Sequence, residues 1–175
     1  EEPEAAAAMA KEKLSRFPEA FRDYWLAGMR AKLGLMTTEA DDGALAADLL
    51  DLINRHSADF TNTFRSLASD PLPETAMFEA RDFKEWNERW RARLNRQPDS
   101  WAASRRLMYS ANPAVIPRNH RVEEALEAAV QRADFTVMEK LMEVLSQPFE
   151  DPPEAAGYHL PAPPSAQPYQ TYCGT

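Results

Sequence analysis

The sequence predicts an all-α protein: an irregular bundle of about six to eight helices followed by an extended, proline-rich tail. Only five glycines occur among 175 residues, whereas alanine, leucine, glutamate and arginine, which favour helices, are abundant. Apolar residues recur at intervals of three and four along most of the chain, as they do on one face of a helix. No stretch alternates apolar and polar residues over the length of a strand, and no internal repeat of the kind that builds solenoids is found.

The first two helices are expected on either side of a proline. Residues 4–16 are rich in alanine, and this helix should stop at Phe17-Pro18. Pro18 suits the first position of a second helix, because its missing N–H loses no hydrogen bond there. Gly34 is expected to end that second helix. The apolar stripe of the second helix is Phe21, Tyr24, Trp25, Met29 and Leu33.

Two further helices are predicted before residue 70. Thr38 and Asp41 are spaced like a capping box, with aspartate in place of the usual glutamate. The helix behind them carries Leu45, Leu49, Leu52 and Ile53 on one face. Ser57 or Asp59 is positioned to cap a shorter helix. That shorter helix carries Phe60, Phe64 and Leu67, and a loop with two prolines follows at 71–73.

The second half of the chain predicts four more helices and then the tail. One helix places Phe83, Trp86, Trp90 and Leu94 on a single face. The next starts at Asp99 or Ser100 and breaks near Asn112, because the residue before a proline avoids the helical region. Asp134 separates the last two helices as an N-cap. Their stripes are Val122, Leu126, Ala129 and Val130 on one, and Phe135, Met138, Leu141, Met142 and Leu145 on the other.

The tail sets the expected domain division. From Gln147 onward, seven prolines in 29 residues preclude regular structure. We therefore predict a helical domain over 1–146 and a proline-rich tail over 147–175.

Composition and spacing disfavour several classes of function. The formal net charge of −8 argues against general nucleic-acid binding, and no apolar run approaches the roughly 20 residues of a membrane span. We expect neither nucleic acid nor membrane as a partner. The three histidines share no metal-ligand spacing, and the five glycines lie singly, without a phosphate-binding loop. We therefore expect neither a metal site nor nucleotide binding by a glycine-rich loop in this chain. A single cysteine also excludes an internal disulfide and a cysteine-rich zinc site.

The beginning of the chain indicates a piece of a longer protein. It starts EEPEAAAAMAKEKL, without an initiator methionine and already with helical composition. The AAAAMA stretch lacks the basic flank and long apolar region of a signal peptide, so we expect a cytoplasmic protein.

The segment 81–106 is locally basic and aromatic. It carries eight Arg and Lys against four Asp and Glu, with three tryptophans between them. One interpretation is a site for an acidic partner or a nucleotide phosphate. The other is that the tryptophans belong to the core and the arginines to a solvated face, some of them paired with acidic residues of other helices. The helical spacing of the aromatic residues favours the second.

The stretch NPAVIPRNHRVEEAL contains two candidate site residues. Arg118 and Arg121 lie near a predicted helix start, where they are candidates for binding an anion or for contacting the rest of a larger protein. The alternative is a rigid connector, in which polar side chains such as Asn112 and Asn119 satisfy backbone groups of the turns.

Five segments, taken in order, resemble the carboxy-terminal third of the selenoprotein O family, also known as the YdiU family. They are MRAKLGL at 29–35, LLDLINRHSADFTNTFRSL at 49–67, NPAVIPRNHRVEEALEAA at 112–129, DFTVMEKLMEVLSQPFEDPP at 134–153, and the closing YHLPAPP and YQTYCGT. The resemblance covers nearly the whole chain. Its more specific parts are NPAVIPRN and the terminal cysteine motif.

The resemblance implies a kinase-like parent enzyme. Members bind ATP in a flipped orientation and, with a divalent metal (Mg or Mn), transfer AMP onto Ser, Thr or Tyr hydroxyls of other proteins. The motifs for that chemistry belong to the amino-terminal kinase-like core and are missing here, so no catalytic or nucleotide-binding residue is carried over. The resemblance makes this chain the helical region that packs on that core. The core and the protein substrates of the parent are its implied partners.

One residue carries over from the family, Cys173. Members end in a short tail that holds a cysteine or selenocysteine, which the resemblance implies is redox-active and pairs with a cysteine of the kinase-like core. An exposed thiol is partly thiolate at neutral pH and exchanges with disulfides. Here the end reads Cys-Gly-Thr, where other members have serine-containing ends. The alternative is an incidental exposed thiol.

A competing hypothesis comes from a different class of function. The chain could be an independent, non-enzymatic helical interaction module that docks through the aromatic and arginine-rich helix 82–97. A piece of a larger protein should expose an apolar patch where the rest was removed, whereas an autonomous module should have a closed, polar surface.

Overall fold

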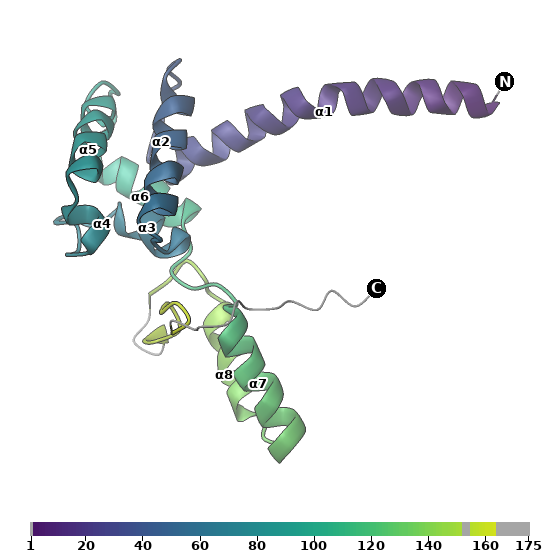
Figure 1. Ribbon diagram of the computed structural model, residues 1–175, viewed down its shortest axis with the longest axis vertical. Helices are drawn as coiled ribbons and strands as arrows, with labels where there is room; N and C mark the ends of the chain where they lie inside the picture. Colours follow the sequence, from purple (N-terminus) through teal and green to yellow (C-terminus); the bar gives the residue numbers. More distant parts are fainter. Residues whose placement is uncertain (1, 152–154, 164–175) are drawn as a thin grey trace. The chain divides into compact units, whose positions relative to one another are not determined.

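The structure of the protein is a computed structural model, which describes residues 2–151 and 155–163. Eight helices and no strand occur in the described residues, which confirms the predicted all-α class (Figure 1). The helices are α1 (Glu2–Lys32), α2 (Asp42–Arg55), α3 (Phe60–Ser66), α4 (Ala76–Glu79), α5 (Arg81–Leu94), α6 (Trp101–Ala111), α7 (Asn119–Arg132) and α8 (Thr136–Leu145). No helix among the described residues is long and apolar enough to cross a membrane.

The chain divides into two compact units, Glu1–Pro113 and Ala114–Thr175, here called unit 1 and unit 2. Unit 1 contains α1 to α6, and unit 2 contains α7 and α8. Residues 156–163 of unit 2 form turns and irregular backbone. The division that the sequence suggests at 146 and the extended character of the whole tail stay predictions.

α1 is one continuous helix, so the predicted stop at Phe17-Pro18 is wrong. Pro18 lies inside the helix. An internal proline costs about 3 kcal/mol, because it removes one backbone hydrogen bond and crowds the preceding turn. Strong helix formers before it and the packed segment after it nevertheless keep both sides helical. The ribbon changes direction part-way along α1, as is common for helices that contain proline (Figure 1).

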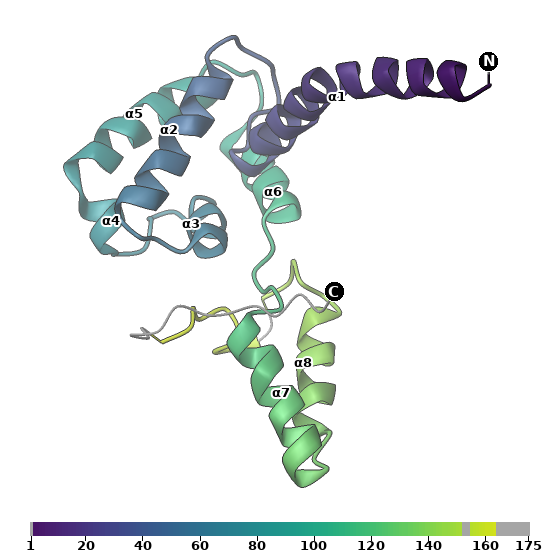
Figure 2. The same ribbon diagram turned by 45° about the vertical axis from the view of Figure 1, so that its right-hand side comes forward.

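The interior of unit 1 is built around two tryptophans of α5. α2 packs on α5, and the end of α1 packs on α6 (Figure 2). Trp86 and Trp90 are fully buried, and their rings stack with centroids 5.7 Å apart. Their indole N–H groups donate to the carbonyl oxygens of Leu45 and Leu33, each at 2.9 Å. Large aromatic surfaces are therefore removed from water without leaving a buried polar group unpaired.

Most of the predicted helix ends in unit 1 are confirmed. The side chain of Asp59 accepts a hydrogen bond at the start of α3, and that of Ser100 does so at the start of α6. α6 ends at Ala111, directly before Asn112. The capping box at Thr38 and Asp41 is wrong: Asp41 occupies the N-cap position of α2, but its side chain makes no capping bond. The short α4, capped by Thr75, was missed.

Gly34 ends α1 as predicted, and its position requires glycine. Its φ of +72° is in the left-handed region. A Cβ atom added there would lie 3.1 Å from both the Cβ and the carbonyl oxygen of Ser104. The glycine therefore lets the backbone turn while α6 approaches closely.

Unit 2 is a helical hairpin with a small interior. α7 ends at Ala133, whose φ of 49° is left-handed. Asp134 accepts hydrogen bonds from the backbone N–H and hydroxyl of Thr136, so it caps the first turn of α8 as predicted, although Phe135 holds the N-cap position. The predicted stripe of α7 is wrong. Its buried residues are Ala125 and Ala128, whereas Leu126 and Val130 are exposed.

Candidate functional site

Arg121 joins the start of α7 to the turn at 155–158. Its guanidinium donates to the carbonyl oxygen of Gly157 at 3.1 Å and to Glu124 Oε2 at 2.9 Å, and it lies 5.5 Å from the ring centroid of Tyr158. Arg118 is the N-cap residue of α7, and its carbonyl oxygen accepts from the N–H of Arg121. These contacts are those of an arginine that fixes a connector. Anion binding by Arg118 and Arg121 stays a prediction.

The other predicted site residue, Cys173, lies outside the described residues. Its redox role likewise stays a prediction.

The strongest electrostatic feature of unit 1 is a buried carboxylate, Asp42. Its side chain is 0% exposed, and that of Arg93 is 3% exposed. Asp42 Oδ1 accepts from Arg93 Nε, and Oδ2 accepts from Arg30 Nε, both at 2.7 Å. Oδ2 also accepts the backbone N–H of Glu39 at 2.9 Å. Burial by itself would raise the pKa of Asp42, but these hydrogen bonds outweigh it and hold the pKa below its usual value.

A second layer of charge surrounds this pair. Arg93 Nη2 donates to the carbonyl oxygen of Thr37 at 2.7 Å. Arg93 Nη1 lies 3.2 Å from Glu39 Oε1, within ion-pair distance but outside hydrogen-bond geometry. Glu39 in turn accepts from Arg96 at 2.6 Å, and this hydrogen bond lowers the pKa of Glu39. Arg30, Glu39, Asp42, Arg93 and Arg96 are together called the ionic cluster.

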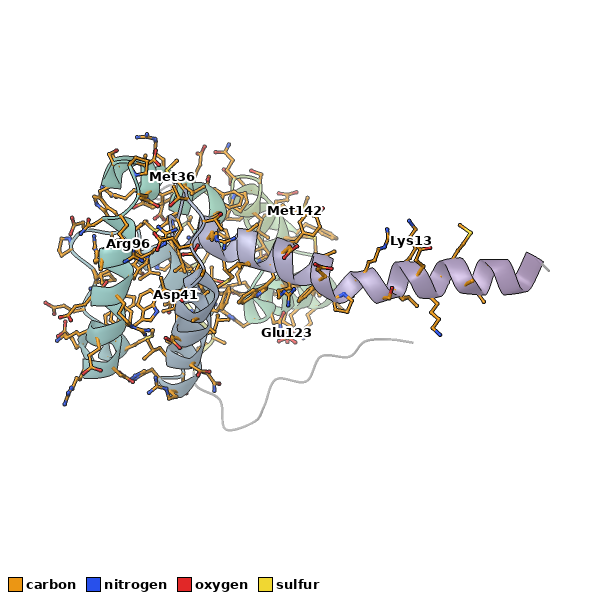
Figure 3. The ribbon with its side chains drawn as sticks, turned by 90° about the horizontal axis from the view of Figure 1, so that it is seen from above. Lys13, Met36, Asp41, Arg96, Glu123 and Met142 are labelled. Carbon is orange, nitrogen blue, oxygen red and sulfur yellow. The ribbon has the colours of Figure 1, made fainter. Side chains whose placement is uncertain are left out.

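The ionic cluster borders a cavity of about 340 Å³ between α2 and α5. Asp41 and Arg96, both labelled in Figure 3, line this cavity. Arg89, which also lines it, pairs with Asp48 at 2.8 Å. Because the arginines around the cavity have acidic partners, the arrangement supports the fold and leaves no excess charge that points to a ligand.

The basic, aromatic segment 81–106 follows the core interpretation. Trp86 and Trp90 are buried. The guanidinium of Arg91 lies 5.1 Å from the ring centroid of Trp90 and 4.5 Å from that of Trp101. Three arginines of this segment, Arg89, Arg93 and Arg96, pair with acidic residues of other elements. The prediction of core tryptophans and partly paired arginines is confirmed.

A polar clasp joins the ends of α1 and α6. Lys32 Nζ donates to the carbonyl oxygen of Ala111 at 3.0 Å, and Asn112 Nδ2 donates back to the carbonyl oxygen of Lys32 at 2.9 Å. Arg65 adds a bond to the carbonyl oxygen of Asn112 at 2.9 Å. Burial lowers the pKa of Lys32. Asn112 thus satisfies backbone groups, as the sequence analysis suggested.

Sequence reasoning missed the ionic cluster, although one signal was available. Arg93 stands three residues after Trp90 and seven after Trp86, on the same helical face. A charge in an otherwise apolar stripe indicates a buried partner. The partner, Asp42, gives no such signal, because acidic residues are common at helix starts.

Among the described residues, no three His, Cys, Asp or Glu side chains are grouped to hold a metal ion. Aromatic packing and internal ion pairs are the main features of unit 1. The described part of the chain belongs to the class of all-α helical regions.

Comparison with known proteins gives the family. The family model described as "Protein adenylyltransferase SelO" matches residues 5–146. Two relatives named "Protein nucleotidyltransferase YdiU" match all 175 residues of this chain. The protein from Alkaliphilus metalliredigens is 49% identical to the chain, and the protein from Syntrophotalea carbinolica is 53% identical. The chain belongs to the SelO family and corresponds to its C-terminal region. It spans 36% of the length of these relatives.

Proposed function

We propose that this chain is the helical C-terminal part of a kinase-like protein adenylyltransferase. The parent transfers AMP from ATP onto Ser, Thr or Tyr hydroxyls of target proteins. The observation that carries the proposal is the match of residues 5–146 to the adenylyltransferase family model, together with about half-identical relatives along the whole chain. In this proposal, ATP and a divalent metal, Mg or Mn, are bound by the rest of the parent.

The chain itself has a structural and regulatory role in this proposal. The charged side chains of the ionic cluster pair with one another inside unit 1. Its partners are the N-terminal kinase-like part of the same protein and, through that part, the target proteins. The parent acts in the bacterial cytoplasm.

The regulatory role belongs to Cys173. Its thiol and a cysteine thiol of the N-terminal part form one S–S bond, releasing two protons and passing two electrons to a disulfide oxidant such as oxidised glutathione. Formation of this bond lowers transfer activity, and reduction restores it.

The test is transfer of labelled AMP from ATP to proteins. It compares this chain and its full-length parent, each reduced and oxidised, with the parent variant Cys173→Ser as control. We expect label only from the parent, suppressed by oxidation in the wild type and unaffected in Cys173→Ser. Equal labelling in every redox state would contradict the regulatory role of Cys173 but not the transfer activity of the parent. A parent that labels no protein would contradict both.

The alternative, an interaction module that docks through 82–97, has weaker support. The aromatic face that would make the contact is buried in unit 1, where Trp86 and Trp90 bond to backbone carbonyls. Docking there would depend on the arginines alone, and several of them already have acidic partners.

A further inference from the structure

The part of α1 before Trp25 carries an apolar stripe that nothing in unit 1 covers. Four large side chains spaced at three and four residues line one side of the helix, and each is between 58% and 81% exposed. They are Leu14, Phe17, Phe21 and Tyr24, here called the α1 stripe. The rings of Phe17 and Phe21 stack with centroids 6.0 Å apart. Single exposed apolar residues are ordinary, but a continuous row of four marks a binding surface.

The residues on the other side of the helix are polar, so the α1 stripe is the apolar face of an amphipathic helix. By helical geometry, Glu12, Ser15, Arg16 and Glu19 lie on the side opposite the α1 stripe. Two of them, Glu12 and Arg16, form an exposed ion pair at 2.7 Å. The segment is therefore amphipathic, a pattern that arises when one side is meant to be buried.

The two halves of α1 differ in what covers them. In the C-terminal half, Met29 and Leu33 are buried in the core of unit 1. In the N-terminal half, the helix projects away from α2 and α5, with Lys13 labelled on the projecting part in Figure 3. Because one end is fixed in the core, the helix presents the α1 stripe in a defined position.

Gly28 gives an independent indication of a close partner. It lies in the interior of α1, on the same side as Phe21 and Tyr24 by helical geometry. A glycine there costs about 1 kcal/mol relative to alanine. A Cβ atom added at Gly28 would meet nothing within 4 Å, so packing inside the described structure does not require the glycine. A small residue on an exposed helix face allows another backbone to approach closely.

The part of the family proteins that this chain does not cover is the candidate for binding to the α1 stripe. This chain covers 36% of its relatives and corresponds to their C-terminal region, so more than half of each relative is a polypeptide that precedes the part described. Since that polypeptide is joined to α1 in the relatives, its effective concentration at the α1 stripe is high, and docking within one molecule prevails over association of two.

We propose that the α1 stripe and Gly28 form the surface on which the N-terminal part of the same protein packs. This inference rests on the proposed function only for the identity of that part. The N-terminal part contributes an apolar surface that covers Phe17, Phe21 and Tyr24, with backbone lying against Gly28. α1 is then the element that couples the helical region to the kinase-like core.

The experiment is hydroxyl-radical footprinting, read by mass spectrometry at Phe17, Phe21 and Tyr24. It compares this chain with the full-length parent, at equal radical dose and at several protein concentrations. Oxidation of the three side chains should fall roughly five- to ten-fold in the parent, in proportion to the accessible surface that docking removes. Equal oxidation in both proteins overturns the proposal. Protection that grows with protein concentration also overturns it and assigns the stripe to a second copy.

Two variants of the parent sharpen the result. Phe21→Asp should restore oxidation of Tyr24 and lower the melting temperature of the parent. Ser15→Asp, which places the same residue on the opposite face of the same helix, should change neither. Equal effects of the two variants contradict docking on the stripe. AMP transfer by the wild-type parent is assayed separately. If the three side chains are protected from oxidation but the parent transfers no AMP, only the proposed function is contradicted. If the parent transfers AMP but the side chains are not protected, only the docking is contradicted.

Discussion

In unit 1 the buried side chains are mostly tryptophan, phenylalanine and leucine, drawn from all six helices. In unit 2 they are fewer and, apart from Leu141, small. Val115, Val144 and Ala155 form one cluster, and Ala114, Ala125 and Ala128 are also buried. Buried apolar area is the main favourable contribution to folding. Unit 1 therefore contains most of the stabilising interior, and unit 2 depends more on hydrogen bonds such as that of Arg121 to Gly157.

The same comparison holds for exposed surface. Unit 2 leaves Leu126, Val130, Phe135 and Met142 in solvent, although it contains only two helices. In unit 1 the exposed large apolar side chains are concentrated on the part of α1 before Trp25. Unit 1 therefore has a packed interior with one uncovered helix, whereas unit 2 is a sparsely packed hairpin. Substitutions in the two units should show this difference in stability.

Trp90→Ala should have the largest effect and should be confined to unit 1. It removes a buried ring and leaves the carbonyl oxygen of Leu33 without its donor, so the free energy of unfolding should fall by about 3–5 kcal/mol. All four tryptophans lie in unit 1, so their fluorescence during urea unfolding reports that unit alone. Amide exchange in α7 and α8 reports unit 2, which should be unchanged.

A matched control comes from unit 2. Val130 is 84% exposed, so Val130→Ala should alter the free energy of unfolding by less than about 0.5 kcal/mol. If Trp90→Ala also increases amide exchange throughout α7 and α8 to the same extent, the two units unfold as one and the comparison is wrong.

Asp42→Asn should have the next largest effect, again in unit 1. It leaves the buried guanidinium of Arg93 with only its longer ion pair to Glu39, which should lower the free energy of unfolding by roughly 2–3 kcal/mol. Because the folded pKa of Asp42 is depressed, its stabilising contribution is complete above the unfolded pKa near ~3.9 and is lost as pH falls through the folded pKa.

The pH dependence provides the check. Wild-type unit 1 should lose stability as the pH drops below about 4, and Asp42→Asn should lose less over the same range. Asp48→Asn removes an exposed partner of Arg89 and serves as control, with an effect below about 1 kcal/mol. Identical pH profiles for wild type and Asp42→Asn mean that other carboxyl groups dominate the acid response.

Arg121→Ala should have the smallest effect, confined to unit 2. Loss of its bond to Gly157 should cost about 1 kcal/mol and increase amide exchange at 155–158 and in the first turn of α7. Arg132→Ala removes the same charge at the other end of α7 and should leave that exchange unchanged. If both variants act alike, net charge rather than the contact determines the result.

Local pattern predicted much of the fold, because helices and their ends depend on neighbouring residues. The stripe with Trp86 and Trp90, the caps at Asp59 and Ser100, and the stop at Gly34 were all found this way. Pro18 was misjudged because a proline signals a boundary locally, whereas packing and the propensity of the flanking segments decide whether the helix continues.

Long-range partners could not be predicted from pattern. In α7, small residues face the neighbouring helix, and the spacing of Leu126 and Val130 does not reveal which side that helix covers. Asp42 and Arg93 are 51 residues apart in sequence, and Arg121 and Gly157 are 36 apart. Such pairs depend on the arrangement of whole elements. The motifs predicted the family, which the family model confirms. The predicted role of Cys173 stays untested, because this residue lies outside the described residues.

The clasp between Lys32 and Asn112 has a mechanical consequence. Asn112 is the next-to-last residue of unit 1, and its side-chain amide is bonded to the backbone where α1 ends. Tension on the chain beyond Pro113 is therefore transmitted to the end of α1 as well as along α6. The hydrogen bonds of Lys32 and Arg65 to the backbone at 111 and 112 oppose the same displacement. Separating Asn112 from the end of α1 therefore requires the loss of several hydrogen bonds.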